Sequence, residues 1–469
     1  MERVESRLPS SILGIARLRS IFALFDIRRP RAVGRNSEVK GFNMSYEKVV
    51  VIGGGTISHV RNHLALAAVA YGGTAIQIAD LVGRHPGHIY HTDLILTKMA
   101  DPRYERSTKV DAKTSNPYET NQDITTLVDQ LIADDQVRVV FFNVALCDFS
   151  GEIEDVSSGK YASRLKSREG ERTLTLTMQD KLLGRFRKER KDIFLIGFKT
   201  TAGASEDEQY IAGLNLLKSN SVNMVLANDT VTRNNMIIVP EEARYAVTTD
   251  RKHALTTLVD MAMARSQLHF TRSTVIPGET VDWNGDEVPD SLREVVNHCI
   301  AKGAYKPFRG NTAGHFAYKV DDTTFITSKR KTNYNNLDKV GLVKVVSTGR
   351  DSVVAHGFKP SVGGQSQRII FEQHPEADCI VHFHSPVTQN VNASLLIPRR
   401  LQQWLECGSH ECGLNTSVGL REVEPGIKVV YLEEHGPNIV FNRNIDPNRV
   451  TSFIDRYFDL EAKTGGLLA

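Results

Sequence analysis

Three histidines in the C-terminal third of the chain have the spacing of a metal site. His382 and His384 lie in the apolar segment DCIVHFHS, and His435 follows the apolar segment KVVYL. Residues i and i+2 of a strand project to the same face, so the first two imidazoles can bind one cation. Three histidine ligands leave one coordination position open, as a catalytic metal requires. The sequence therefore predicts a site for Zn²⁺ or another divalent metal.

The segments around these histidines resemble the class II aldolase/adducin superfamily. The matching segments are, in order, NTAGHFAYK, TTFITSKRKTNYNNL, HPEADCIVHFHSP and EEHGPN. The family includes fuculose-phosphate-type aldolases, ribulose-phosphate 4-epimerases and methylthioribulose-phosphate dehydratases. The resemblance covers residues 310–442 and implies an α+β domain. It also implies a metal, usually zinc, that polarises the hydroxyl and carbonyl oxygens of a small substrate.

The same resemblance implies a phosphate site, in which backbone N–H groups and hydroxyls hold the substrate phosphate. The matching positions are Thr312, Gly314, Ser328 and Lys329. Ordinary turn chemistry explains these residues equally well. His315 stands where the family has a polar Asn, and it either contacts the substrate or fills space.

One departure from the family concerns the acid/base residue. The aldolases carry a carboxylate about nineteen residues before the first metal histidine, where this chain has SVGGQSQRI and no acid. The dehydratases place a glutamate after the metal strand instead, and the corresponding segment here is WLECGSHECG. Glu406 is the preferred general base and Glu411 is the alternative, although either can be an exposed helical glutamate. Cys407, His410 and Cys412 crowd this segment, but their spacing fits no common four-ligand zinc module.

Apolar segments also alternate with helical segments in the N-terminal half. KVVVIGGG, VRVVFFNVAL, DIFLIGF and NMVLAND read as buried strands. Strands that alternate with helices predict a Rossmann-like, three-layer α/β domain with a parallel sheet. The glycines after the first strand let backbone N–H groups approach a phosphate, although tight turns of this kind occur in any α/β fold.

Several segments over residues 46–265 resemble the phosphopantothenoylcysteine synthetase (DFP) family. They are GGGTISHVR, NVALCDFSG, SRLKS, LIGFKTTAG and NMVLANDTV. The resemblance implies that a nucleoside triphosphate, CTP or ATP, activates a substrate carboxylate. The positions that it assigns to nucleotide binding are Gly53, Gly54, Gly55, Thr56, Asp148, Lys166 and Asn228. Residues 61–74 and the segment GFKTTA depart from the family, so we expect a substrate other than phosphopantothenate, or nucleotide binding alone.

The length of 469 residues is too great for one ordinary core, so more than one domain is expected. The predicted organisation is a basic extension (1–45), a synthetase-like domain (46–273), a linker (274–289) and an aldolase-like metal domain (290–469). The first 43 residues hold eight arginines, which indicates a mitochondrial transit peptide, a disordered extension or a start codon set before Met44.

The composition of the chain bears on its binding partners and on its cellular compartment. The net charge of +3 gives no argument for a nucleic-acid partner, and no apolar run reaches the roughly 18 residues of a membrane helix. Five scattered cysteines favour a reducing compartment, so we expect a cytoplasmic protein, or a mitochondrial one if the extension is a transit peptide.

The leading hypothesis is a two-domain enzyme, a metal-dependent lyase joined to a nucleotide-dependent ligase-like domain. Its substrate is expected to be a small, phosphorylated or carboxylated hydroxycarbonyl compound. Relatives of both domains assemble, so a homo-oligomer (dimer or tetramer) is expected. In one alternative only the metal domain is catalytic and the first domain senses a nucleotide. In another the chain is a non-enzymatic, adducin-like interaction protein, which predicts missing metal ligands.

Overall fold

A computed structural model describes residues 47–87, 91–100, 118–153, 157–350 and 352–465. The described residues all belong to one compact unit. The predicted N-terminal extension lies outside the described residues.

The first sheet has seven strands in the order β11-β10-β9-β8-β5-β1-β4. Its strands are β1 (Lys48–Gly55), β4 (His91–Leu96), β5 (Val137–Ala145), β8 (Phe194–Thr201), β9 (Met224–Asp229), β10 (Asn235–Ile238) and β11 (Arg244–Thr248). The first five are mutually parallel, and β10 and β11 add an antiparallel edge. All five parallel strands therefore end at one edge of this sheet.

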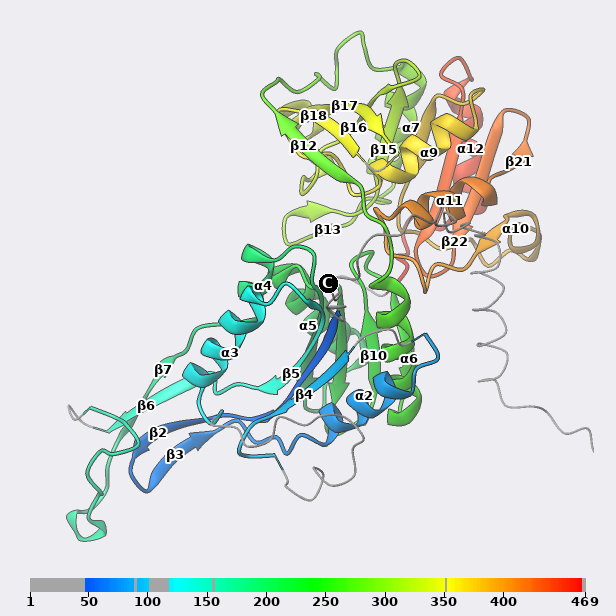
Figure 1. Ribbon diagram of the computed structural model, residues 1–469. Coiled ribbons are helices and arrows are strands. Elements are labelled where there is room, and N and C mark those ends of the chain that lie inside the picture. The colour runs from blue at the N-terminus through cyan, green and yellow to red at the C-terminus, as the bar shows by residue number, and fades with distance from the viewer. Residues whose placement is uncertain (1–46, 88–90, 101–117, 154–156, 351, 466–469) are drawn as a thin grey trace, which may run out of the picture. The chain divides into compact units, whose positions relative to one another are not determined.

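Helices cover both faces of this sheet (Figure 1). On one side are α2 (Gly73–Arg84) and α6 (Arg251–Arg265), and on the other are α3 (Asn121–Ala133), α4 (Leu183–Glu189) and α5 (Glu206–Asn220). Side chains of β1 alternate between the two faces of the sheet. Val49 and Val51 pack beneath α2 and α6, and Val50 and Ile52 pack beneath α3, α4 and α5. The predicted three-layer α/β domain with a parallel sheet is confirmed.

Two hairpins extend from this domain. One pairs β2 (Ile57–Arg61) with β3 (Leu64–Ala67), and the other pairs β6 (Phe149–Ile153) with β7 (Leu174–Met178). The short helix η2 (Ser167–Glu169) precedes β7.

The second sheet is mainly antiparallel and has the order β12-β18-β17-β16-β15-β19-β23-β22-β20. Its strands are β12 (Arg272–Ile276), β15 (His315–Lys319), β16 (Thr324–Ser328), β17 (Leu342–Gly349), β18 (Ser352–His356), β19 (Cys379–His382), β20 (Arg399–Arg400), β21 (Arg421–Glu424, paired with β22), β22 (Ile427–Leu432) and β23 (Gly436–Phe441). A small ribbon of β13 (Pro307–Phe308) and β14 (Asn311–Thr312) stands apart from it.

Helices pack on both faces of this sheet too. The helices are α7 (Asp290–Ala301), η3 (Tyr334–Asn336), α8 (Leu337–Val340), α9 (Gly364–Gln373), α10 (Val391–Leu396), α11 (His410–Gly419) and α12 (Pro447–Tyr457). The apolar residues of α7 and α12 share one core, those of α9 share the other, and α11 packs against α9. The predicted α+β architecture of the C-terminal region is confirmed.

The segment predicted as a linker, 274–289, contains part of a strand. β12 begins at Arg272 and pairs in parallel with β18, and Val281 bridges to Leu342. Part of this segment therefore belongs to the second sheet, and the predicted domain limits stay a prediction.

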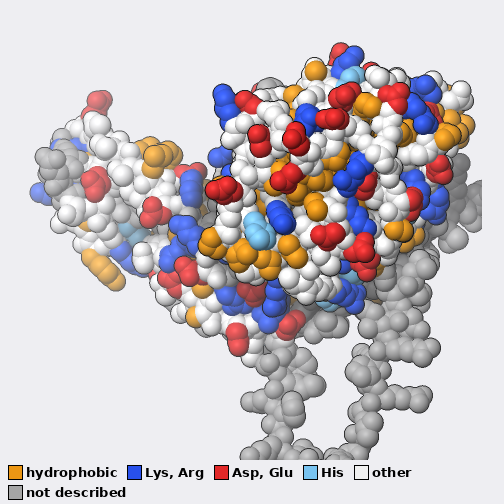
Figure 2. Space-filling model, turned by 90° about the horizontal axis from the view of Figure 1, so that it is seen from above, with side chains coloured by type: hydrophobic (Ala, Val, Ile, Leu, Met, Phe, Trp, Pro, Cys, Tyr) orange, Lys and Arg blue, Asp and Glu red, His pale blue; other side chains and the backbone are white. Residues whose placement is uncertain are grey.

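Charged side chains of both signs are mixed on the face drawn in Figure 2, with apolar side chains between them. This agrees with the small net charge of the sequence. Among the described residues, no helix is both long and apolar enough to cross a membrane.

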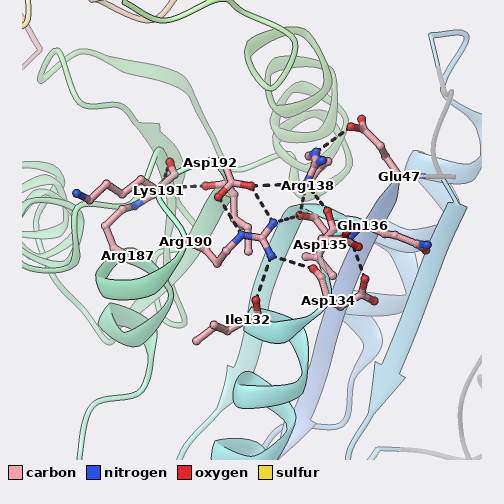
Figure 3. Close-up of polar contacts among 12 residues, drawn as sticks. Glu47, Ile132, Asp134, Asp135, Gln136, Arg138, Arg187, Arg190, Lys191 and Asp192 are labelled. Carbon is pink, nitrogen blue, oxygen red and sulfur yellow. Dashed lines mark hydrogen bonds and ion pairs between the residues drawn. The ribbon is translucent and has the colours of Figure 1, made fainter. Parts of the chain in front are cut away.

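Arg190 joins three elements at the amino-terminal edge of the parallel sheet (Figure 3). Its guanidinium donates to the carbonyl oxygens of Ile132, Asp134 and Val137 at 2.9–3.1 Å and to both carboxylate oxygens of Asp192. The end of α3, the start of β5 and the entry to β8 are therefore held by one planar side chain. The hydrogen bond from Arg190 also holds the pKa of the Asp192 carboxyl below its usual range.

We predict that Arg190→Lys lowers the free energy of unfolding by about 2 kcal/mol, because an ammonium cannot reproduce the guanidinium fork. Urea denaturation measures this loss. The control is Arg185→Lys on α4, since Arg185 makes one ion pair, to a half-exposed Asp129, and should change stability by less than about 1 kcal/mol. Equal effects of the two substitutions would contradict the role of Arg190.

Candidate metal centre

The three predicted metal histidines converge in the structure. One ring nitrogen from each of His382, His384 and His435 lies within 4.8 Å of the other two, and all three side chains are buried. The Nε2 atoms of His382 and His435 are 3.2 Å apart. Two nitrogens on one tetrahedral zinc are separated by roughly 3.3 Å, so this spacing suits a shared ion.

Strand alternation explains why His382 and His384 face the same way. Cys379, Val381 and Phe383 belong to the core beneath α7 and α12, whereas Ile380 belongs to the core beneath α9. The histidines share the parity of Ile380, so they point away from the first core.

Two glycines bring the neighbouring chain segments against this strand. A Cβ on Gly314 would lie 2.6 Å from the carbonyl oxygen of His382, and a Cβ on Gly436 would lie 2.1 Å from that of Phe383. Both glycines have positive φ, 101° and 141°, which other residues rarely adopt. Gly436 thereby lets the turn that carries His435 pack directly against residues 382–384.

Hydrogen bonding and burial set the state of the imidazoles. Nδ1 of His382 donates to the carbonyl oxygen of Pro437 at 2.7 Å, which leaves the Nε2 lone pair free for a ligand. Burial lowers the pKa of His382 to about 4, and it lowers the pKa values of His384 and His435 well below their usual range. All three rings are therefore neutral near pH 7, which is the metal-binding form.

These residues fit a divalent metal. Nδ1 of His384 is buried and has no hydrogen-bond partner among the described residues. A buried polar atom without a partner is costly, and a cation among the three rings gives the cluster the partner that it lacks.

Three of the four residues predicted to hold phosphate contact Tyr334. The Tyr334 hydroxyl is 2.9 Å from the carbonyl oxygen of Gly314 and 3.0 Å from the Ser328 hydroxyl, and the Tyr334 N–H donates to Thr312 Oγ1. The ammonium of Lys329 lies 3.4 Å from the ring centre of Phe358. The structure brings Thr312, Gly314 and Ser328 together beside the metal strand, and their role in phosphate binding stays a prediction.

His315 lies against the metal cluster, opposite His382 in the β15–β19 pairing. The centres of the two rings are 4.7 Å apart, and Nδ1 of His315 is 2.9 Å from the Gln367 side-chain nitrogen. A Cβ on Gly363 would lie 2.1 Å from the His315 ring. Gly363 lies in the segment SVGGQSQRI, where the resemblance led us to expect a carboxylate, and the imidazole of His315 occupies the space that a side chain at position 363 would need.

The two predicted base candidates have different surroundings. Glu406 is buried, and both of its carboxylate oxygens accept from Asn223 Nδ2 at 3.3 Å. Burial raises the pKa of Glu406 to about 7, although nearby Arg265 opposes the shift. Glu411, in the first turn of α11, accepts from the ring and the backbone N–H of His269. No hydrogen bond links either carboxylate to the three histidines among the described residues, so their catalytic role stays a prediction.

Sequence reasoning missed two residues that contact this centre. Thr464 donates from its N–H to the carbonyl oxygen of His384 and from its hydroxyl to that of His435. Cys407 places its sulfur 3.6 Å from Nε2 and 3.7 Å from Nδ1 of His435. Only the cysteine gave any signal in the sequence, because it lies in the CGSHEC segment beside the candidate bases.

The residues predicted to bind nucleotide lie mostly at the carboxyl ends of the parallel strands. Gly53–Gly55 end β1, Asp148 follows β5 and Asn228 is in β9, whereas Lys166 precedes η2. Ligands of open α/β sheets bind at this edge. The nucleotide role of these residues stays a prediction.

Thr56 and Asp148 already have partners in the chain. The Thr56 hydroxyl donates to Asn121 Oδ1 at 2.6 Å and accepts from the Cys147 N–H, while Asp148 pairs with Lys181. Thr56 therefore joins β1, β5 and α3.

A cavity of about 510 Å³ opens at the N-terminus of α3, and none of the seven predicted nucleotide residues lines it. Its Lys98 and Lys160 both pair with Glu119, at 3.1 and 2.6 Å. The hydrogen bond from Lys160 is the largest cause of the lowered pKa of Glu119.

Comparison with known proteins gives a family match for the C-terminal region. Residues 295–442 match the family model described as "Class II Aldolase and Adducin N-terminal domain". The C-terminal region carries the predicted aldolase-type domain. No curated protein matches the chain.

Solved structures resemble each region of the chain. The N-terminal part is similar to a DNA/pantothenate metabolism flavoprotein from Streptococcus pneumoniae (18% identity, 46% of this chain and 96% of that chain, TM-score 0.35). It is also similar to a Cab2 mutant in complex with phosphopantothenate-cysteine (13%, 56% and 95%, TM-score 0.38). An L-fuculose 1-phosphate aldolase matches as well (14%, 36% and 85%, TM-score 0.27). These identities and TM-scores are too low to support an inference about activity.

We predict that Gly363→Ala destabilises the protein by about 1–3 kcal/mol, because the new Cβ overlaps the His315 ring. The φ of Gly363 is −66°, so backbone strain does not contribute. In a His315→Ala background the same substitution should cost less than about 0.5 kcal/mol, since the ring is gone. Urea denaturation of the four proteins gives this coupling energy.

Gly364→Ala is the matched control for this cycle. A Cβ at position 364 meets nothing within 4 Å, and the residue begins α9, so alanine should be neutral or slightly stabilising there. If Gly363→Ala were as well tolerated as Gly364→Ala, the two side chains would not compete for this space.

Proposed function

We propose that the C-terminal domain is a metal-dependent lyase of the class II aldolase type. Its substrate is a small hydroxycarbonyl compound that carries a phosphate or a carboxylate. The observation that carries the proposal is the convergence of three buried imidazoles within 4.8 Å, with the Nδ1 atom of His382 already bonded to the Pro437 carbonyl oxygen. The match of residues 295–442 to the aldolase and adducin family model supports it.

The residues around the cluster have separate tasks in this reaction. His382, His384 and His435 would hold the metal, which would supply a Lewis acid for the hydroxyl and carbonyl oxygens of the substrate. The glycine-rich turn at Gly314 and the hydroxyl groups of Thr312 and Ser328 receive the substrate phosphate. Glu406, or Glu411 as the alternative, exchanges the proton, because position 363 has no carboxylate.

An alternative from another class is a non-enzymatic interaction protein of the adducin type. That reading expects one or more metal ligands to be absent. The complete set of three histidines favours the lyase.

The first test is the metal content of dialysed protein, measured by elemental analysis. We expect about one zinc or other divalent ion per chain in the wild type and a loss of most of it in His382→Ala, because a cation held by two imidazoles dissociates more readily. His253→Ala is the control, since His253 is exposed at the start of α6. A wild-type protein that retains no metal and binds no added zinc would exclude the lyase.

We further propose that the N-terminal domain binds a nucleoside triphosphate, CTP or ATP. Support comes from the glycine-rich end of β1, which lies between the ends of β5 and β4 in the parallel sheet. In the fuller form of this proposal the domain is a ligase that activates a carboxylate. In the alternative form it senses the nucleotide, and only the metal domain is catalytic.

Calorimetric titration with CTP and ATP tests nucleotide binding. We expect one of them to bind, and Lys166→Ala to weaken binding by about tenfold through loss of a charge-assisted hydrogen bond to phosphate. Lys191→Ala, at an exposed position before β8, should have no effect. Release of pyrophosphate in the presence of carboxylate substrates separates a ligase from a sensor, and equal binding by the two variants would remove Lys166 from the site.

A further inference from the structure

The Cys407 thiol contacts the metal cluster and has no role in the proposed reaction. Its Sγ lies 3.6 Å from Nε2 of His435, the same nitrogen that lies 3.2 Å from Nε2 of His382. A sulfur and a nitrogen bound to one tetrahedral zinc are separated by roughly 3.5 Å. The sulfur is also 3.7 Å from Nδ1 of His435, so it lies beside the ring about equally far from both nitrogens and has to shift toward Nε2 to share an ion with it.

The loop that carries Cys407 is anchored on both sides. Before it, the Glu406 carboxylate accepts from Asn223, and after it Ser409 forms a bridge with Phe270 while its N–H donates to the Glu406 carbonyl oxygen. The position of the thiol beside His435 is thus set by the fold rather than by a free loop.

A second cysteine lies close to the first. Gln402 Nε2 is 3.8 Å from Sγ of Cys407 and 3.4 Å from Sγ of Cys412, so both thiols lie against the same amide. Cys412 is buried on α11, and the structure records no contact between its sulfur and the three histidines. Of the two sulfurs, only that of Cys407 faces the cluster.

We propose that Cys407 is a fourth protein ligand of the metal, which closes the coordination shell in the absence of substrate. This rests on the proposed metal site. On binding, the Cys407 S–H bond breaks, the proton passes to solvent, and the sulfur forms a bond to the metal without any redox change. The thiol contacts His435 alone, so the step includes a movement of the sulfur toward His382 and His384.

A sulfur ligand has two chemical consequences. Thiolate donors favour zinc and other soft or borderline ions over magnesium and manganese, so the site selects its metal by ligand type. A closed shell of four protein ligands also requires one of them to yield when a substrate oxygen binds, whereas three histidines alone leave that position open.

Cobalt substitution tests this ligand by absorption spectroscopy of the full-length chain under reducing conditions. The wild type loaded with Co²⁺ should show the visible bands of a tetrahedral site together with a sulfur-to-cobalt charge-transfer band in the near ultraviolet. Cys407→Ser should lose the charge-transfer band and still bind Co²⁺ through the three histidines. Cys412→Ser is the matched control and should keep the band.

The outcomes separate this proposal from the proposed function. Failure of the wild type to bind Co²⁺ or Zn²⁺ would overturn the metal site, and the cysteine ligand with it. Binding with no charge-transfer band, or a band that survives in Cys407→Ser, would overturn only the cysteine ligand.

Alkylation of the wild-type protein gives an answer that does not depend on a variant that folds. Iodoacetamide followed by mass spectrometry should label Cys407 in the metal-free protein and leave it unlabelled when one equivalent of Zn²⁺ is bound. The buried Cys412 should stay unlabelled in both states. Equal labelling of Cys407 with and without zinc would contradict the proposal.

Discussion

The metal centre depends on how closely three chain segments approach one another around residues 382–384. Gly314 on one side and Gly436 on the other leave no room for a Cβ against the backbone of this strand end. Because those contacts are made by the main chain, they fix the spacing of the segments more firmly than side-chain packing does. The strand end and the β22–β23 turn therefore bring His382, His384 and His435 to one point, and the start of β15 places His315 against them.

Burying this cluster of histidines without a ligand costs free energy, because the imidazole nitrogens lose their hydration. Four neutral histidines, including His315, lie together with lowered pKa values, and Nδ1 of His384 has no partner among the described residues. A cation replaces lost hydration and couples its binding energy to the stability of the surrounding fold. Thr464 adds to this coupling, because it bonds the carbonyl oxygens of two of the three histidines.

The fold and the three ligands follow from local patterns in the sequence. Continuous apolar strands such as β1 and β5 are typical of a parallel sheet buried on both faces, and the spacing of His382 and His384 fixes their common direction. The contact of His315 with Gly363 and that of Cys407 with His435 join residues far apart in the chain. No periodicity records such pairs. The missing carboxylate was visible in SVGGQSQRI, but the ring that fills its space became identifiable only from coordinates.

Contacts between the N-terminal α/β region and the C-terminal α+β region explain why the position of the loop at Glu406 cannot be predicted from its own sequence. Arg265 is fully buried, pairs with Glu241 at 2.7 Å and donates to the carbonyl oxygen of Gln403, while Asn223 donates to Glu406. An unpaired buried guanidinium costs several kcal/mol, so this pair is stable only while both partners remain in place. The loop bearing Glu406 and Cys407 thus derives its position from residues of the first sheet and its helices. The position of the Cys407 thiol beside His435 therefore depends on the integrity of the first domain.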